Sequence, residues 1–209
     1  MHPLLEGLLD LVYPPACVGC RRRTGSSIFC PDCAAKIERL PGTPGGRDFA
    51  ALLYREPVVS AIHRLKYQGA TFVLPVLGGF LNEAFTRLEL FRVVDCLVPV
   101  PLHPVRFRDR GFNQAELLAR EILRHYDFPL LTRVLVRTRH TPSQTRLPEA
   151  ARRRNVAGAF RVRSASELAG RTCLLVDDVT TTGATLAAAR DTLLAAGAAE
   201  VLTLALARS

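Results

Sequence analysis

The sequence predicts an α/β fold in which a mainly parallel, twisted sheet is flanked by helices and preceded by a small zinc-ribbon-like domain. Three observations support this prediction. Segments typical of strands and of helices alternate after residue 47, two of the strand candidates are almost wholly apolar, and four cysteines form two CxxC pairs near the N-terminus. With 209 residues, of which 48% are hydrophobic, the chain can form one sizeable core and a small appendage, but not two full α/β domains.

The N-terminal cysteines are spaced as ligands of one metal ion. Cys17 and Cys20 form the first CxxC pair, Cys30 and Cys33 form the second, and nine residues separate the pairs. Four thiolates suit a tetrahedral zinc ion with a structural role, because they leave no coordination position open. A disulfide or a redox CxxC motif is the alternative, but the two pairs form a matched set. The Pro/Gly-rich residues 41–46 then predict a boundary between a zinc-binding module with its linker (1–46) and a second domain (47–209).

Strand and helix candidates follow in alternation. Residues 49–54 are typical of a strand, and residues 57–66 and 72–85 have the apolar spacing of helices. The apolar run 94–100 predicts a strand buried on both faces, and Asn113 predicts the N-cap of a helix over residues 114–125. Further strands are expected over residues 131–136, 160–162, 172–176 and 201–207, and a helix over residues 183–196 with Gly197 at its end.

The apolar segments are too short for a membrane span, since none reaches the roughly 18 residues that a spanning helix needs. Residues 1–12 lack a basic start and contain acidic residues, which indicates a short amphipathic helix rather than a signal peptide. We therefore expect a soluble protein in the cytoplasm, where thiols stay reduced. Cys96 and Cys173 fall inside predicted strands and are expected to be core residues.

The positive charge of the chain is concentrated in one segment. The net charge is +9, and residues 101–163 hold fourteen arginines but only five acidic residues, so that the rest of the chain is balanced. A GC-rich genome could explain the preference for arginine over lysine, but it does not explain the position of the charge. The excess predicts a polyanion near this segment, such as single-stranded DNA. The expected contacts are the clusters Arg106, Arg108, Arg110 and Arg152, Arg153, Arg154.

Residues 174–185 are the most informative stretch. A buried strand leads into Asp177 and Asp178, and a loop of small hydroxyl residues then opens a helix at Gly183. Backbone N–H groups of such a loop and of the helix N-terminus bind anions well. The two carboxylates would repel a phosphate group, whereas ribose hydroxyls could donate hydrogen bonds to them. The alternative is a plain helix N-terminus whose dipole the acids stabilise. The stretch therefore predicts a site for a ribose 5-phosphate group.

This stretch resembles the motif with which type I phosphoribosyltransferases bind phosphoribosyl pyrophosphate (PRPP). The resemblance implies the type I phosphoribosyltransferase fold and places Asp177 and Asp178 at the ribose hydroxyls as catalytic residues. It also implies that Mg²⁺ arrives with PRPP. The residues that would bind the 5-phosphate group are Val179, Thr180, Thr181, Thr182, Gly183, Ala184 and Thr185.

A narrower resemblance covers nearly the whole chain. The segments 65–69, 97–104 and 110–115 are similar to the ComF family of competence proteins, as are Thr141, Gln144 and the CxxC pairs. This resemblance implies a part in DNA uptake and natural transformation. Single-stranded DNA or a competence helicase would be the partners, and a homodimer is a candidate assembly.

Further residues are candidates for contacts with the substrate. Arg106 and Arg110 follow the strand after which phosphoribosyltransferases place their pyrophosphate loop, and guanidinium groups suit phosphate oxygens. A solvated basic loop is the alternative. Lys66, one of only two lysines, offers a compact charge. Gln144 is a candidate catalytic residue, because its polar segment resembles the mobile catalytic hood of the fold.

Two classes of function remain open at this stage. The first is an enzyme that transfers the phosphoribosyl group of PRPP to an acceptor. The second is a non-catalytic competence factor that keeps the fold and binds single-stranded DNA or a protein, because a fold does not by itself determine an activity.

Overall fold

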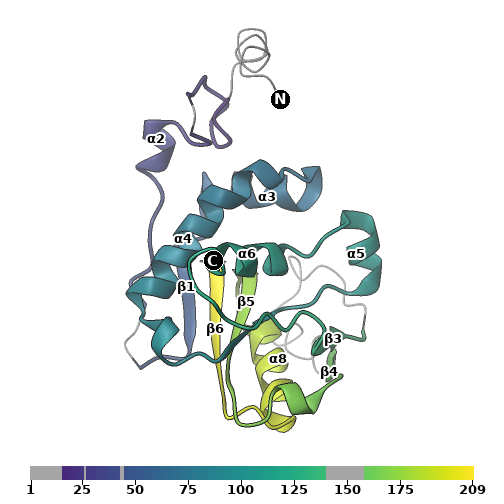
Figure 1. Cartoon of the computed structure of the whole chain (residues 1–209). Helices are drawn as coiled ribbons and strands as arrows, with labels where there is room; N and C mark the ends of the chain where they lie inside the picture. The colour runs from purple at the N-terminus through teal and green to yellow at the C-terminus, as the bar shows by residue number, and fades with distance from the viewer. Residues whose placement is uncertain (1–15, 26, 43–44, 140–157) are drawn as a thin grey trace.

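A four-stranded parallel sheet forms the centre of the fold (Figure 1). The computed structural model describes residues 16–25, 27–42, 45–139 and 158–209. The strand order is β1-β6-β5-β2, and each neighbouring pair is parallel. A short antiparallel pair of strands, β3 and β4, lies outside this sheet. The strands are β1 (Asp48–Leu53), β2 (Cys96–Pro99), β3 (Leu135–Arg137), β4 (Phe160–Val162), β5 (Thr172–Thr180) and β6 (Glu200–Arg208).

Helices cover both faces of the sheet, as its apolar strands require. On one face, α4 packs against β1 and β6, and α6 packs against β2 and β5. On the other face, α8 packs against β5 and β6, and it also contacts β4. Leu174 and Leu175 belong to two different core clusters, because successive residues of a strand point to opposite faces. The helices are α2 (Pro31–Ala34), α3 (Val58–Gln68), α4 (Leu74–Arg87), α5 (Pro104–Arg110), α6 (Gln114–Ile122) and α8 (Ala184–Ala195), with 3₁₀ turns η1 (Thr71–Val73), η2 (Leu90–Arg92) and η4 (Ala165–Glu167).

Most of the predicted elements are confirmed within a few residues. Asn113 caps α6, since its side-chain oxygen accepts a hydrogen bond from the Ala115 N–H group at 3.2 Å. Cys96 and Cys173 are fully buried in β2 and β5. The strand β5 is longer than predicted, because it continues through both aspartates to Thr180 and pairs with β6 along its whole length.

One interpretation of the basic segment is wrong. Arg106 and Arg110 do not lie in a solvated loop but on the short helix α5. Pro104 suits the first turn of this helix, and the His103 Nδ1 atom accepts a hydrogen bond from the Val105 N–H group at 3.3 Å. Gly111 ends the helix with a φ of +81°, a conformation that glycine adopts without strain.

The N-terminal cysteine segment packs against the sheet domain. Its residues Cys17, Phe29 and Ile37 belong to the same core cluster as Val58 of α3. The backbone that follows α2 extends the sheet beside β1, because the Leu40 N–H group donates to the Ala51 carbonyl at 2.9 Å. The domain boundary at residue 46 stays a prediction.

None of the helices in the described part of the chain combines the length and the apolar character needed to cross a membrane. The predicted amphipathic helix over residues 1–12 lies outside the described residues.

Candidate functional site

A cavity of about 290 Å³ lies at the carboxyl ends of β2 and β5, where parallel α/β sheets commonly bind ligands. Helices α3 and α5, the start of α6 and Arg137 of β3 complete its wall. Gln144 lies outside the described residues, as do His140 and Arg152–Arg154. All the other residues predicted for the ribose-phosphate site line this one cavity: Lys66, Arg106, Arg110, Asp177, Asp178, Val179, Thr180, Thr181, Thr182, Gly183, Ala184 and Thr185.

The segment from the end of β5 to the start of α8, residues 179–185, which we call the phosphate loop, forms one end of the cavity. Gly183 is the N-cap of α8 and has a φ of +74°, which disfavours any other residue. In contrast to Asn113 of α6, it supplies no side chain to cap the helix. The Thr182 hydroxyl is buried without a hydrogen-bond partner among the described residues. The free N–H groups and this hydroxyl can therefore donate to an anion.

The two aspartates occupy different environments. Asp178 is 9% exposed, and its carboxylate accepts a hydrogen bond from Lys66 Nζ at 2.8 Å. The Asp177 carboxylate accepts one from the Asp178 N–H group at 2.9 Å. Burial and the negative charge of Asp178 raise the pKa of Asp177 to about 7, although Lys66 and Arg137 act in the opposite direction. At neutral pH, Asp177 therefore exists in both protonation states.

Lys66 compensates the charge of this acidic pair. Burial alone would lower its pKa, but the charges of Asp178 and Asp177 and the hydrogen bond to Asp178 outweigh burial, so the pKa is raised. The side chains of Lys66 and Asp178 are only 19% and 13% exposed, which makes this a largely buried ion pair.

Three guanidinium groups give the rest of the cavity a positive character. Arg110 donates to Gln114 Oε1 at 2.6 Å and lies over the Tyr67 ring, with 5.6 Å from its Cζ atom to the ring centre. Burial lowers the pKa of Arg110 and of Arg137, and the charge of Arg106 lowers both further, while the aspartates oppose this. Arginines placed this close together favour the binding of an anion with several charges.

The arginines of α5 do not all share this position. Arg106 and Arg110 are one helical turn apart and both line the cavity, whereas Arg108 is not part of its lining. Ten lining residues were not predicted as site residues, although Tyr67 and Gln114 belong to segments with a ComF-like sequence. No local signal in the sequence indicates Tyr54 or Arg137, which are distant in the chain from the residues predicted for this cavity. The ten residues are Tyr54, His63, Tyr67, Val100, Pro101, Leu102, Asn113, Gln114, Ala115 and Arg137.

A larger cavity of about 650 Å³ lies behind the phosphate loop, over β1 and α8. It shares residues 180–184 with the cavity at the aspartate pair, but three of its charged groups, Asp48, Arg190 and Arg208, already have structural partners. Arg190 pairs with Asp48, and the Thr203 hydroxyl donates to the same carboxylate at 2.8 Å. The cavity at the aspartate pair is therefore the better candidate site.

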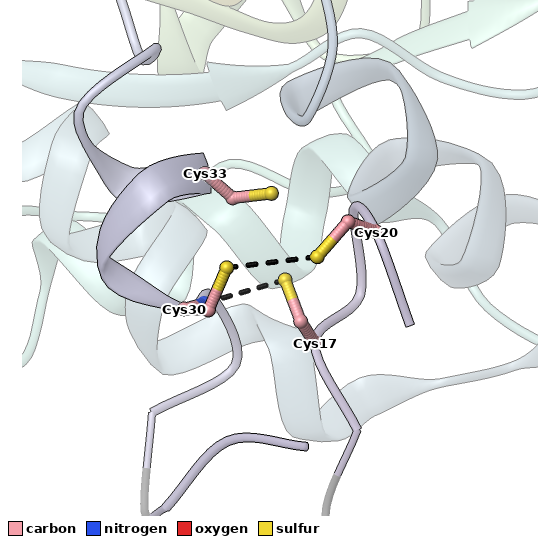
Figure 2. Close-up of side chains that lie close together, drawn as sticks. All are labelled: Cys17, Cys20, Cys30 and Cys33. Atoms are coloured by element: carbon pink, nitrogen blue, oxygen red, sulfur yellow. Dashed lines mark hydrogen bonds between the residues drawn. The ribbon is translucent and has the colours of Figure 1, made fainter. Parts of the chain in front are cut away.

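The four N-terminal cysteines form a metal centre (Figure 2). Their sulfur atoms point toward one another and lie within 4.8 Å of each other. The Cys20 and Cys30 sulfurs are 3.6 Å apart. Sulfurs bound to one zinc ion at about 2.3 Å in a tetrahedron are roughly 3.8 Å apart, so the arrangement fits zinc.

The backbone around Cys17 favours its thiolate, whereas burial and the neighbouring thiols raise the pKa of Cys33 to about 12. Burial raises the pKa of the Cys17 thiol, but hydrogen bonds from the backbone of Cys20, Cys30 and Gly19 outweigh burial and lower the pKa to about 6. The Cys30 N–H group donates to the Cys17 sulfur at 3.3 Å. With four protein ligands the centre is closed, which suits a structural role.

Comparisons with known proteins agree with both parts of this description. Residues 108–209 match the family model of the phosphoribosyl transferase domain, and residues 8–44 match that of the double zinc ribbon domain. Competence protein F of Haemophilus influenzae is 31% identical over 98% of this chain and 95% of its own length. DNA utilization protein YhgH of Escherichia coli is 32% identical over 92% of this chain and 90% of its own. Competence protein ComFC of Streptococcus pneumoniae is 28% identical, with coverages of 92% and 80%.

Proposed function

Since the chain belongs to the ComF family of competence and DNA utilization proteins, with a phosphoribosyltransferase-type domain and a four-cysteine zinc-binding module, we propose that it binds PRPP and transfers the phosphoribosyl group to an acceptor. One observation carries this proposal. A single cavity combines an uncapped helix N-terminus, a pair of aspartates and several arginines. PRPP has the complementary groups: a 5-phosphate, a ribose diol and a diphosphate at C1.

Each part of the cavity has a role in the proposed reaction. The N–H groups at the start of α8 and the Thr182 hydroxyl hold the 5-phosphate. Asp177 and Asp178 accept hydrogen bonds from the ribose hydroxyls. Arg106 and Arg110 face the diphosphate, whose negative charge grows as the bond from C1 to oxygen breaks and C1 gains oxocarbenium character. Mg²⁺ bound to PRPP would offset part of the charge of the diphosphate.

The protonation state of Asp177 predicts how this binding depends on pH. A protonated Asp177 carries no charge and accepts hydrogen bonds less well, so PRPP with Mg²⁺ should bind more tightly as pH rises through the Asp177 pKa of about 7. Between about pH 6 and about pH 8 we expect an increase of about tenfold in affinity, measured by isothermal titration calorimetry.

The Asp177→Asn variant is the control for this experiment. The phosphate groups of PRPP also titrate near pH 6. Their contribution to the pH dependence of the affinity remains in this variant, whereas the contribution of Asp177 is lost. Equal pH dependence of the wild type and Asp177→Asn would contradict the role of Asp177. A wild type that binds no PRPP at either pH, or that releases no pyrophosphate with any acceptor, would contradict binding or catalysis, respectively.

A second candidate function is the binding of single-stranded DNA during DNA uptake. The concentration of the +9 charge in residues 101–163 favours it, because one diphosphate does not require fourteen arginines. Arg108 and its half-exposed neighbour Phe107 lie on α5 outside the cavity lining, where they could contact a strand. A competence helicase and a second copy of the chain are further proposed partners.

The DNA proposal predicts a steep dependence of affinity on salt. The logarithm of the affinity should fall with that of the salt concentration, with a slope of roughly −0.7 for each contacted phosphate on a single strand. Replacing Arg108, or the cluster Arg152–Arg154, by alanine should flatten this slope and leave PRPP binding unchanged. Absence of DNA binding at low salt would refute this proposal, and competition between PRPP and DNA would indicate one shared site.

A further inference from the structure

Gln114 is a buried polar residue in the cavity wall that the proposed reaction leaves without a role. It is the first residue of α6 and is 1% exposed. Its Oε1 atom accepts a hydrogen bond from Arg110 Nη1 at 2.6 Å. Because a guanidinium group only donates, the amide oxygen must be the atom that faces Arg110, and Nε2 is directed elsewhere.

The amide nitrogen of Gln114, Nε2, is buried and lacks a hydrogen-bond acceptor among the described residues. A buried donor without a partner destabilises a protein, and an apolar side chain of the same size would avoid this penalty. The presence of glutamine therefore indicates a use for its oxygen atom, which is the contact with Arg110.

Arg110 is held from two sides by neutral groups. The Gln114 amide of α6 binds one nitrogen, and the Tyr67 ring of α3 lies against the guanidinium plane, 5.6 Å from Cζ to the ring centre. The charge of Asp178 attracts the guanidinium group, and that of Arg106, one turn earlier on α5, repels it. A carboxylate at position 114 would hold the guanidinium equally well but would neutralise it. The amide fixes the group and leaves its charge for a ligand.

The position of Arg110 indicates which part of the ligand it contacts. The loop after β5 takes the 5-phosphate in the proposed function, and the aspartates take the ribose. Arg110 belongs to the helix that follows β2, the strand next to β5, and lines the cavity together with Val100 and Pro101. It therefore reaches the cavity from the β2 side, whereas the loop that takes the 5-phosphate follows β5.

We propose that Gln114 is a positioning residue, which fixes Arg110 so that its charge receives the diphosphate at C1 of PRPP. This inference rests on the proposed function and deepens it. It assigns the preference for PRPP over ribose 5-phosphate to the pair Gln114 and Arg110.

The test compares these two ligands, which differ only in the diphosphate. Gln114→Met keeps the size of the side chain and removes the oxygen that holds Arg110. We expect titration calorimetry with Mg²⁺ to show an affinity for PRPP that is about tenfold lower, with ribose 5-phosphate affected less than about twofold. In an Arg110→Ala background the same substitution should have no further effect, because Gln114 acts through Arg110.

Two results of the Gln114→Met comparison would overturn the inference. One is an equal loss of affinity for both ligands, and the other is a further loss of PRPP affinity in the Arg110→Ala background. Gln114→Glu provides a second variant that keeps the hydrogen bond and should fold, yet should also lose PRPP affinity because it neutralises Arg110. Full PRPP affinity in this variant would equally refute the inference. A wild type that binds neither ligand would instead refute the proposed function itself.

Discussion

Removal of zinc is expected to unfold the N-terminal module and to destabilise the sheet domain with it. Three of the four cysteines, Cys17, Cys30 and Cys33, are buried members of the main core cluster. Without the ion, four polar thiols would have to hold this part of the core together. Structural zinc contributes about 10–16 kcal/mol of apparent binding free energy in zinc-finger peptides near neutral pH, more than the whole stability of many domains.

The measurement is thermal unfolding before and after chelation, together with metal analysis that should find one zinc ion per chain. Cys96→Ala is the matched control, since Cys96 is buried in β2 and is not one of the four clustered cysteines. It should retain zinc, whereas Cys30→Ala should lose it. Purified protein without zinc, or a Cys17–Cys20 disulfide under reducing conditions, would contradict the assignment.

The contacts of the module extend this effect toward the candidate site. A side-chain atom at Gly19 would come within 2.5 Å of Pro57 Cβ, so the first cysteine loop lies directly against the start of α3. The same helix carries Lys66, which pairs with Asp178. Chelation should therefore weaken PRPP binding as well as stability.

The parts of the site that could be predicted from the sequence are those encoded by neighbouring residues. The stretch from β5 to α8 contains its strand, its acids and its loop within a few positions, so local rules are sufficient. The same holds for the CxxC pairs and for the N-cap Asn113. In these segments the local sequence is compatible with one type of structure, although the pairing of β5 with β6 extends the strand through both aspartates to Thr180.

The parts that could not be predicted depend on contacts between distant residues. Lys66 and Asp178 are 112 positions apart, and no sequence rule pairs them. The helix α5 was missed because its seven residues contain no buried residue, so that its sequence lacks the apolar periodicity of longer helices. Which arginines face the cavity depends on the orientation of that helix, as Arg106 and Arg108 illustrate.

Replacement of Asp177 or Asp178 by alanine is expected to weaken PRPP binding by about tenfold to a hundredfold with the fold preserved. The loss of a charged hydrogen-bond partner typically corresponds to about 1.5–3 kcal/mol. Titration calorimetry with Mg²⁺ measures this loss. Asp191→Ala is the matched control. Asp191 lies on α8 and lines the larger of the two cavities described above, but it does not line the candidate site.

The two variants should differ in stability, and this difference tests the environment of each acid. Because the folded state raises the pKa of Asp177, ionisation of this residue opposes folding of the wild type. The free energy of unfolding of Asp177→Ala, relative to that of the wild type, should therefore increase as pH rises from about 4 to about 7 and should not change below that window. Asp178→Ala instead leaves the largely buried Lys66 without its partner and should lower the melting temperature. The further change Lys66→Met should restore it. A folded double variant of Asp177 and Asp178 that binds PRPP as tightly as the wild type would rule out the ribose site.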